Sequence, residues 1–262
     1  MPFEIEIIKW LQGLRTNFLD QLFELITMLG EEMVIILVLG FVYWALSKEK
    51  GKKLAVIVFI SMGINSLLKI VFARLRPFQV DAEIINLRPE TSQSYAMPSG
   101  HTQGASTVFF GLAYFLKKRY LWILAIVITI LVGLSRMYIG VHYLSDVFVG
   151  GVLGLLMVIG IDYLLNRIKH QKRIYISLSI ISVVALTTMI IIQANKTTSP
   201  VDFYHELEVM SKMFGTLLGF GLGILFEEKY VNFSNHKNMN KNTIRFVMGI
   251  GFILIVRIGL KG

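Results

Sequence analysis

The sequence predicts an all-α fold, a polytopic transmembrane helical bundle of about eight spans. The first observation behind this prediction is composition: 55% of the 262 residues are hydrophobic, 16% are charged, and the mean hydropathy is +0.65. A soluble domain averages about 25% charged residues, so this composition belongs in lipid. The second observation is that long apolar runs alternate with short polar loops. Backbone amides in lipid must be bonded within their own segment, which makes these runs helices.

A helix needs about 20 mostly apolar residues to cross a bilayer. By that measure the expected spans cover residues 22–46, 53–74, 101–117, 120–138, 146–165, 174–194, 211–227 and 243–260. We expect the first span to belong to one helix that starts near Asp20 and continues through Gly30. Glu31 and Glu32 would then mark the water boundary, the alternative being that one of them faces a site.

The chain divides into three parts by pattern. Residues 1–19 are expected to form an interfacial amphipathic helix, although an ordinary first helix packed on the bundle fits equally well. The apolar residues that recur there at helical spacing are Phe3, Ile7, Leu11 and Leu14. Residues 20–165 form a core with the chemical motifs, and residues 166–262 add C-terminal transmembrane helices. In the seventh span, glycines at every fourth position predict close helix packing, namely Gly215, Gly219 and Gly223.

The basic residues indicate how the chain lies in the membrane. The formal net charge is +9, and its excess lies in the loops after the first, third, fifth and seventh spans. These loops contain Lys48, Lys50, Lys52, Lys53, Lys117, Lys118, Arg119, Arg167, Lys169, Lys172, Arg173, Lys229, Lys237, Lys241 and Arg245. The positive-inside rule places them in the cytoplasm, so both termini and the outer loops 75–100 and 195–210 face outward. We therefore expect a multi-pass plasma-membrane protein in contact with the lipid bilayer, and no nucleic-acid partner.

Two polar stretches interrupt the apolar pattern at the outer surface. Lys69 and Arg76 are seven residues apart, so on a helix they would share a face, and Pro77 would then end that helix. Snorkelling would explain one such cation, whereas two on one face suggest an anion clamp. The second stretch, Pro98-Ser99-Gly100-His101, opens the third span with cap residues and a glycine. The exposed amides of such a helix start can hold a phosphate, and capping has no need of the histidine.

A third stretch runs from Ser135 to Asp146. If it is helical, His142 and Asp146 lie one turn apart, so the carboxylate could accept the proton of one imidazole nitrogen and leave the other free to attack. Arg136 offers a planar fork for phosphate oxygens. A metal site is the competing use of the two histidines and Asp146. Four cations aimed at one place would repel a divalent ion and attract a phosphate, so we expect no metal ion and no cofactor. The absence of cysteine also excludes thiolate ligands and disulfides.

In these three motifs the sequence resembles the type 2 phosphatidic acid phosphatase superfamily, the membrane lipid phosphate phosphatases. The pattern of that family is a lysine, six residues and Arg-Pro; Pro-Ser-Gly-His; and Ser-Arg, five residues, His, three residues, Asp. All of it stands here in order between Lys69 and Asp146, within a resemblance that covers roughly residues 20–165. It departs from simpler bacterial members in the two extra spans at its C-terminus.

The resemblance implies a metal-independent phosphatase whose catalytic residues are His142, His101 and Asp146. His142 would be the nucleophile, Asp146 would orient it, and His101 would protonate the leaving oxygen. The phosphate would be held by Lys69, Arg76, Ser99, Gly100 and Arg136. The expected substrates are a polyprenyl diphosphate, then phosphatidate or phosphatidylglycerophosphate, and then a sphingoid phosphate. The alternative from another class is a transporter or scramblase of anionic lipids, which would use the cations and have no need for a His–Asp pair.

Overall fold

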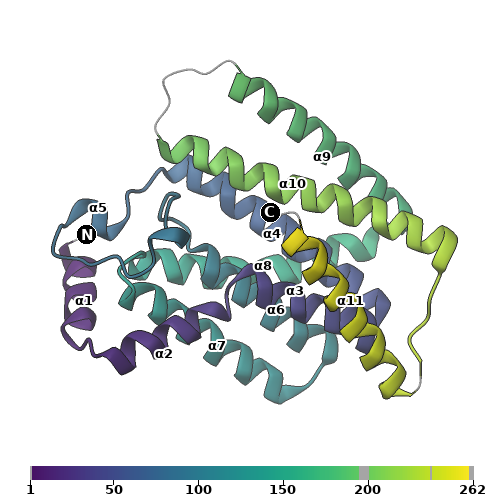
Figure 1. Ribbon diagram of the computed structural model, residues 1–262, viewed down its shortest axis with the longest axis horizontal. Coiled ribbons are helices and arrows are strands. Elements are labelled where there is room, and N and C mark those ends of the chain that lie inside the picture. The colour runs from purple at the N-terminus through teal and green to yellow at the C-terminus, as the bar shows by residue number, and fades with distance from the viewer. Residues whose placement is uncertain (1, 195–200, 237, 260–262) are drawn as a thin grey trace.

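The computed structural model describes residues 2–194, 201–236 and 238–259, and every regular element in these ranges is a helix (Figure 1). The elements are α1 (Pro2–Gly13), α2 (Asn17–Met28), α3 (Glu32–Gly40), η1 (Phe41–Leu46), α4 (Lys48–Phe72), α5 (Pro77–Val80), η2 (Pro89–Thr91), α6 (Gly100–Leu116), α7 (Arg119–Tyr138), α8 (Leu144–Arg167), α9 (Gln171–Ala194), α10 (Val201–Phe226), η3 (Glu227–Val231) and α11 (Met239–Gly259). The prediction of an all-helical fold is confirmed for the described chain.

Six of the described helical segments are long and apolar enough to cross a membrane, and the bent pair of α2 with α3–η1 would be a seventh. Helix α6 has only 17 residues. It lies at the centre of the fold, packed against α4, α7 and α8. These elements correspond to the expected spans, but the count of eight crossings remains a prediction.

The expected continuous first span is wrong, because the chain breaks between α2 and α3 with a bend of 46°. The cause is the close approach of this break to α6. A Cβ atom on Gly30 would lie 2.5 Å from the carbonyl oxygen of His101. Only a residue without a side chain allows that approach, and a straight helix could not bring its backbone so near. The break therefore places the end of α2 beside the start of α6.

The N-terminal segment is also two helices rather than one, because α1 ends at Gly13 and α2 begins at Asn17 after a Thr16 cap. One face of α1 packs on the protein: Ile5 and Ile8 are buried in a cluster with Ile84, Ala96 and Tyr143. The exposed apolar side chains of α1 include Phe3 and Trp10, and Leu14 just after the helix is exposed too. The helix thus contacts the bundle on one face and shows apolar side chains on another, so both sequence interpretations describe part of it.

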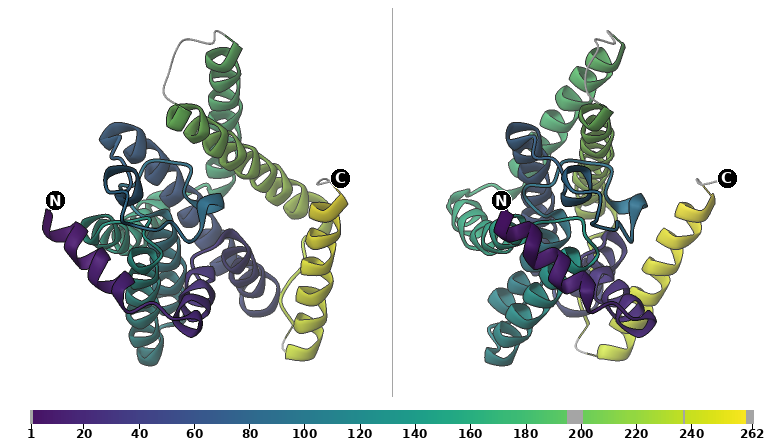
Figure 2. Two further views of the ribbon diagram at one scale, coloured as in Figure 1. Left: turned by 60° about the vertical axis from the view of Figure 1, so that its left-hand side comes forward. Right: turned by 90° about the vertical axis from the view of Figure 1, so that its left-hand side faces the viewer.

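The main core lies where α4, α6, α7 and α8 meet. Its buried side chains include Val56, Ile57, Phe110, Ala125 and Val158. Helices α9 and α10 pack against each other, and α10 also lies along α4 (Figure 1). Helix α11 stands at one edge, beside α3 and η1, as both views of Figure 2 show. The bundle of residues 20–165 thus forms the centre, and the later helices cover one side of it.

The end of the bundle away from the three motifs is held by ion pairs. Lys48 at the start of α4 lies 2.8 Å from Glu227, and Lys52 lies 3.0 Å from Glu228, both in η3 after α10. Lys48 and Lys52 are buried. Two of the lysines counted for the cytoplasmic loops are therefore neutralised by the C-terminal helices. The charge asymmetry that predicts the orientation is smaller than the sequence suggests.

Two expectations about the C-terminal part are wrong. The expected outer loop 195–210 is helical from Val201 onward, and its first six positions lie outside the described residues. The glycine repeat of the seventh span does not face a helix: a Cβ on Gly215, Gly219 or Gly223 would meet no atom of the described chain within 4 Å. Gly221 instead packs against Ser179 of α9. The glycine repeat therefore predicted correctly that α10 packs closely on another helix, but it predicted the wrong face of α10 for that contact.

Candidate active site

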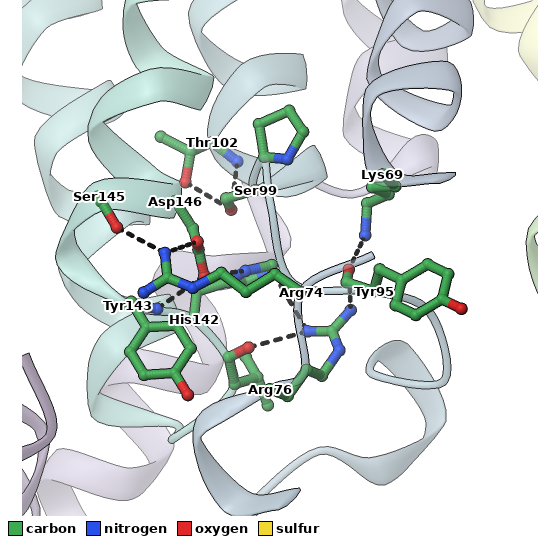
Figure 3. A network of polar contacts seen from close by, with 12 residues as sticks. Lys69, Arg74, Arg76, Tyr95, Ser99, Thr102, His142, Tyr143, Ser145 and Asp146 are labelled. Carbon is green, nitrogen blue, oxygen red and sulfur yellow. Dashed lines mark hydrogen bonds and ion pairs between the residues drawn. The ribbon is translucent and has the colours of Figure 1, made fainter. Parts of the chain in front are cut away.

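Residues of all three motifs lie close together, and Figure 3 shows Lys69, Arg76, Ser99, His142 and Asp146 among them. The motif residues come from the last turn of α4, the loop that follows it, the start of α6, the last turn of α7, the loop after α7 and the start of α8. The polar and charged motif residues that are buried are Lys69, Arg76, Ser99, Ser135, Arg136, His142 and Asp146. A buried cation is costly without an anion or a set of acceptors. Three of them at one place indicate a site built for negative charge.

Lys69 and Arg76 meet, but not on a shared helix face as expected. Helix α4 ends at Phe72, because Ala73 adopts a left-handed backbone with φ of 43°. Arg76 therefore lies in the following turn, as the cap residue of α5. Both side chains reach Ser94: the Lys69 ammonium donates to its hydroxyl at 2.7 Å, and Arg76 Nε donates to its carbonyl at 2.5 Å. The loop 75–100 is thus what brings the two cations together.

The start of α6 is a capped helix terminus that neighbouring helices hold in place. Ser99 is the cap residue of α6, and its hydroxyl accepts from the amide of Thr102. Asn65 of α4 donates to the carbonyl of Pro98 at 3.3 Å, which ties the turn to the neighbouring helix. On the other side, a Cβ on Gly150 of α8 would lie 2.7 Å from the Ser99 carbonyl. The amides at this terminus are therefore held rigidly and carry the positive end of the helix dipole.

His142 lies in the loop between α7 and α8, with its two nitrogens in different surroundings. Nε2 is 3.3 Å from a guanidinium nitrogen of Arg76, the same nitrogen that donates to the Val141 carbonyl at 2.9 Å. Burial, and then the charges of Arg76, Arg136 and Lys69, hold the pKa of His142 well below its usual value. The ring is therefore neutral near pH 7, and its Nε2 faces the cations.

Nδ1 of His142 faces Asp146, at 3.4 Å from Oδ2. This is ion-pair distance, but within the described chain the nitrogen has no hydrogen-bond partner. His142 is not helical; it precedes α8, whose cap residue is Tyr143. The same carboxylate oxygen accepts the backbone amide of Tyr143 at 2.9 Å. The expected His–Asp pair is therefore adjacent, and Asp146 has stronger partners than the imidazole.

Arg136 and His101 lie on the side of the site formed by the α2–α3 break. Arg136 donates to the hydroxyl of Thr27 at 3.0 Å and to that of Thr91 at 3.3 Å. Its Nε, and Nε2 of His101, are buried and without a partner in the described part of the chain. Buried polar atoms without partners are uncommon in proteins and cost about 1–3 kcal/mol each. Both atoms are explained if a polar ligand occupies the space beside them.

The two glutamates near this break have different positions. Glu31 lies 2.7 Å from Arg88 of the loop 75–100, and Arg88 also binds Glu90. Glu32 is largely exposed, with Arg257 of α11 at 3.9 Å. Its position at the water boundary remains a prediction. Glu31 instead fastens the loop that supplies Thr91 to Arg136.

Metal binding has no ready set of ligands here. No group of three or more histidine, aspartate or glutamate side chains in the described ranges is arranged to hold a metal ion. Asp146 is already occupied by Tyr143 and by Arg74, whose guanidinium lies 2.7 Å from Oδ1. The absence of a metal requirement remains a prediction about the reaction, to be tested by chelation.

The sequence motifs omit several residues that contact the motif side chains or lie beneath them. Arg74 is a further cation two positions before Arg76, but it occupies no motif position. Asn65 and Gln103, which bond each other at 2.8 Å beneath the α6 start, have no local pattern that reveals them. Glu4 is far away in sequence and enters the site only through the fold.

Comparison with known proteins gives a consistent result. The chain matches the PAP2 superfamily over residues 50–171 and the transmembrane extension of PAP2 superfamily phosphatases over residues 211–262. It is 33% identical over 174 residues to phosphatidylglycerophosphatase B of Bacillus subtilis, covering 60% of this chain and 82% of the relative. It is 31% identical over 153 residues to undecaprenyl-diphosphatase of Sulfolobus acidocaldarius, covering 58% and 73%.

A more distant relation extends to eukaryotes. The chain is 30% identical over 155 residues to sphingosine-1-phosphate phosphatase 2 of Homo sapiens, covering 57% of this chain and 38% of that protein. Among solved structures, it is similar to a transmembrane PAP2-type phosphatidylglycerolphosphate phosphatase from Bacillus subtilis, with a TM-score of 0.56 and 28% identity. That similarity covers 64% of this chain and 87% of the solved one.

Proposed function

The chain belongs to the PAP2 superfamily, and we propose that it is a membrane phosphatase that hydrolyses a lipid phosphate or diphosphate through a phosphohistidine intermediate. The observation that supports this most is the orientation of His142. Its Nε2 faces Arg76 at 3.3 Å, and its Nδ1 faces Asp146 at 3.4 Å. A phosphate drawn to the cations would thus meet a neutral imidazole nitrogen whose opposite side is next to a carboxylate.

The phosphate-binding groups would be Lys69, Arg76 and Arg136, together with the α6 terminus at Ser99 and Gly100. The cations approach from α4, the outer loop and α7, and the helix terminus adds backbone amides. Charge on the phosphoryl oxygens increases little during transfer, so most of the catalysis would come from positioning and from fixed positive charge. The cations and amides would supply the charge neutralisation for which other phosphatases use metal ions.

The reaction balances with two histidines and a water molecule. The Nε2 lone pair of His142 forms a bond to phosphorus while the bond from phosphorus to the leaving oxygen breaks. Nε2 of His101 gives its proton to that oxygen, and the negative phosphate beside the ring favours the protonated form that this requires. Water then attacks the phosphohistidine and loses its proton to His101. Inorganic phosphate leaves, and both rings return to their starting states.

The reaction would take place at the outer face of the plasma membrane, with residues 166–262 as additional transmembrane helices. The lysine-rich loops support this orientation, although Lys48 and Lys52 are paired with acidic partners. Helix α1 would lie at the interface, where its exposed Phe3 and Trp10, with Leu14 just after the helix, could enter the lipid boundary. A lipid phosphate in the outer leaflet would then present its headgroup at the depth of the motif residues.

The substrate we favour is a polyprenyl diphosphate, followed by phosphatidate or phosphatidylglycerophosphate. Undecaprenyl-diphosphatase and phosphatidylglycerophosphatase B are both among the relatives, and the match covers most of their length. A sphingoid phosphate is the second candidate, supported by the match to sphingosine-1-phosphate phosphatase 2. All of these substrates share a phosphate on a lipid, which is the chemistry that the site can recognise.

The test is phosphate release from the purified protein in detergent, measured across this panel of lipid phosphates. Wild-type protein should release phosphate, and His142→Ala should not. His170→Ala, at an exposed histidine on the opposite end of the bundle, is the matched control and should behave as wild type. Quenching with radioactive substrate should label wild-type protein with an acid-labile phosphate and leave His142→Ala unlabelled. Labelled His142→Ala, or wild-type protein that moves lipid without releasing phosphate, would refute the proposal.

His101 has its own test, based on the leaving group. The group that leaves from a diphosphate or an aryl phosphate is a stable anion. It therefore needs protonation less than the alkoxide that leaves from an alkyl phosphate. The loss of rate in His101→Ala should therefore be smaller on the diphosphate than on the alkyl phosphate. Equal losses on both substrates would show that His101 is not the acid.

A further inference from the structure

Asp146 is bound most closely by a residue outside the three motifs. A guanidinium nitrogen of Arg74 donates to Oδ1 of Asp146 at 2.7 Å and to the hydroxyl of Ser145 at 2.6 Å. Arg74 lies in the loop after α4, so its side chain crosses from that loop to the first turn of α8 (Figure 3). The guanidinium also stacks on the ring of Tyr143, with its carbon 3.9 Å from the ring centroid. These contacts fix the orientation of the Arg74 guanidinium.

The other half of the fork binds the N-terminal helix. The second terminal nitrogen of Arg74 donates to Oε2 of Glu4 in α1 at 2.8 Å. The other oxygen of Glu4 accepts the backbone amide of Ser145 at 2.8 Å. Glu4 therefore touches both Arg74 and the start of α8, and these contacts lie largely away from solvent. A helix that begins the chain is in this way joined to the carboxylate beside the nucleophile.

We propose that Arg74 is a positioning residue for the His142–Asp146 pair, and that Glu4 of α1 shares its guanidinium. The proposal rests on the function proposed above, because His142 must be the nucleophile for the orientation of Asp146 to matter. Arg74 does not face the phosphate space, since both ends of its fork are taken by carboxylates. Its effect would pass through Asp146.

The geometry explains how the effect works. Arg74 donates to Oδ1 of Asp146, and the Tyr143 amide donates to Oδ2 at 2.9 Å, so the carboxylate plane is held from two directions. Oδ2 is thereby left 3.4 Å from Nδ1 of His142, close enough to attract an imidazolium and too far to bond the neutral ring. The carboxylate would close on His142 as the ring becomes positively charged by bonding to phosphorus. Stabilisation realised only in that state raises the rate without strengthening substrate binding.

Arg74 also changes the charge that His142 experiences. The charged and titratable groups around the ring are Lys69 of α4, Arg76 of the outer loop, His101 of α6, Arg136 of α7 and Asp146 of α8. Asp146 is the anion of this set, and Arg74 neutralises part of it. Glu4 in turn neutralises part of Arg74. Removal of Arg74 should therefore favour the imidazolium form of His142, and removal of the Glu4 charge should oppose it.

The experiment combines kinetics with NMR titration of histidine rings in the full-length protein. Arg74→Gln should raise the midpoint of the His142 ring titration, because Asp146 loses the cation that neutralises part of its charge. Its kcat should fall with little change in KM, because Arg74 does not touch the phosphate. Arg74→Lys keeps the charge and loses the fork, so it should keep the midpoint near wild type and still lose kcat.

Glu4→Gln should move the midpoint to lower pH, opposite to Arg74→Gln. The control is Lys9→Gln, which removes the other ion pairs of α1, 2.8 Å each to Asp81 and Glu83. It weakens the docking of the same helix and should leave the midpoint unchanged. Midpoints that stay at the wild-type value in both the Arg74 and Glu4 variants, or that move the same way, would overturn the proposal. The ring titration needs no turnover, so its outcome is distinguishable from a failure of the wild-type protein to release phosphate.

Discussion

The contact between Gly30 and His101 allows a sharp test of how the site is assembled. A Cβ on residue 30 would lie 2.5 Å from the His101 carbonyl oxygen and 2.9 Å from its carbonyl carbon. An ordinary contact begins near 3.4 Å, so Gly30→Ala must separate the α2–α3 break from the start of α6 by about 0.9 Å, the difference of 3.4 and 2.5 Å. Both atoms are backbone, which leaves no side chain to rotate away.

The expected cost has two parts. Overpacking in a well-packed region costs about 1–3 kcal/mol of stability, so Tm should fall. A displacement of about 1 Å at a catalytic group can cost about 10²-fold in rate. Arg136 should be disturbed with His101, because it is bound to Thr27, three residues before the glycine. We therefore expect kcat on an alkyl lipid phosphate to fall by about 10²-fold.

The assay is phosphate release and thermal unfolding on the same detergent preparation. Gly160→Ala is the matched control: it adds the same methyl group to α8, where a Cβ meets no described atom within 4 Å. It should leave kcat unchanged and, as an alanine in a helix, slightly raise Tm. Wild-type kcat in Gly30→Ala would refute the reasoning. If only Tm falls, the break supports the fold but does not position His101.

Three further predictions concern orientation, metal and pH. A cysteine at Gln93 should react with an impermeant thiol reagent in intact cells and one at Lys118 should not; the reverse pattern would invert the topology. Activity should survive excess chelator and be inhibited by vanadate, which adopts the five-coordinate geometry of phosphoryl transfer; loss that zinc or magnesium restores would favour a metal site. Because the pKa of His142 is lowered, the acidic limb of kcat/KM should lie below about 6.5. The unfolded chain then binds more protons below that pH, so stability should fall as pH drops, and less so in His142→Gln.

The sequence predicted the membrane helices because hydrophobic length is a property of each segment alone. The bounds of α7, α8 and α9 lie close to the expected 120–138, 146–165 and 174–194. The errors are of another kind. The bend at Gly30 and the unused glycine face of α10 depend on which partner each helix meets, and periodicity within one segment contains no information about a partner.

At the candidate site, too, the sequence predicted which residues belong but not how they come into contact. The candidate phosphate-binding residues could be named because burying a cation or a histidine among apolar runs has a cost that structure alone does not repay. The route by which they meet was wrong for Lys69 and Arg76. A shared helix face was expected, whereas α4 ends at Phe72 and the loop 75–100 places Ser94 in contact with both cations. Spacing therefore identified the chemistry and not the geometry.

The supporting residues were beyond the sequence for a physical reason. Arg74 and Glu4 are 70 positions apart, and each alone looks like an ordinary charged residue near a membrane surface. Glu4 contacts Arg74, and Arg74 contacts Asp146, which is fully buried and is balanced by this nearby charge. A buried carboxylate beside a neutral histidine cannot be left with the amide of Tyr143 alone, so the fold has to bring a cation to it. A cation that pairs with a buried carboxylate therefore has to be sought in the structure, among all cations able to reach that carboxylate. The sequence motif does not identify it.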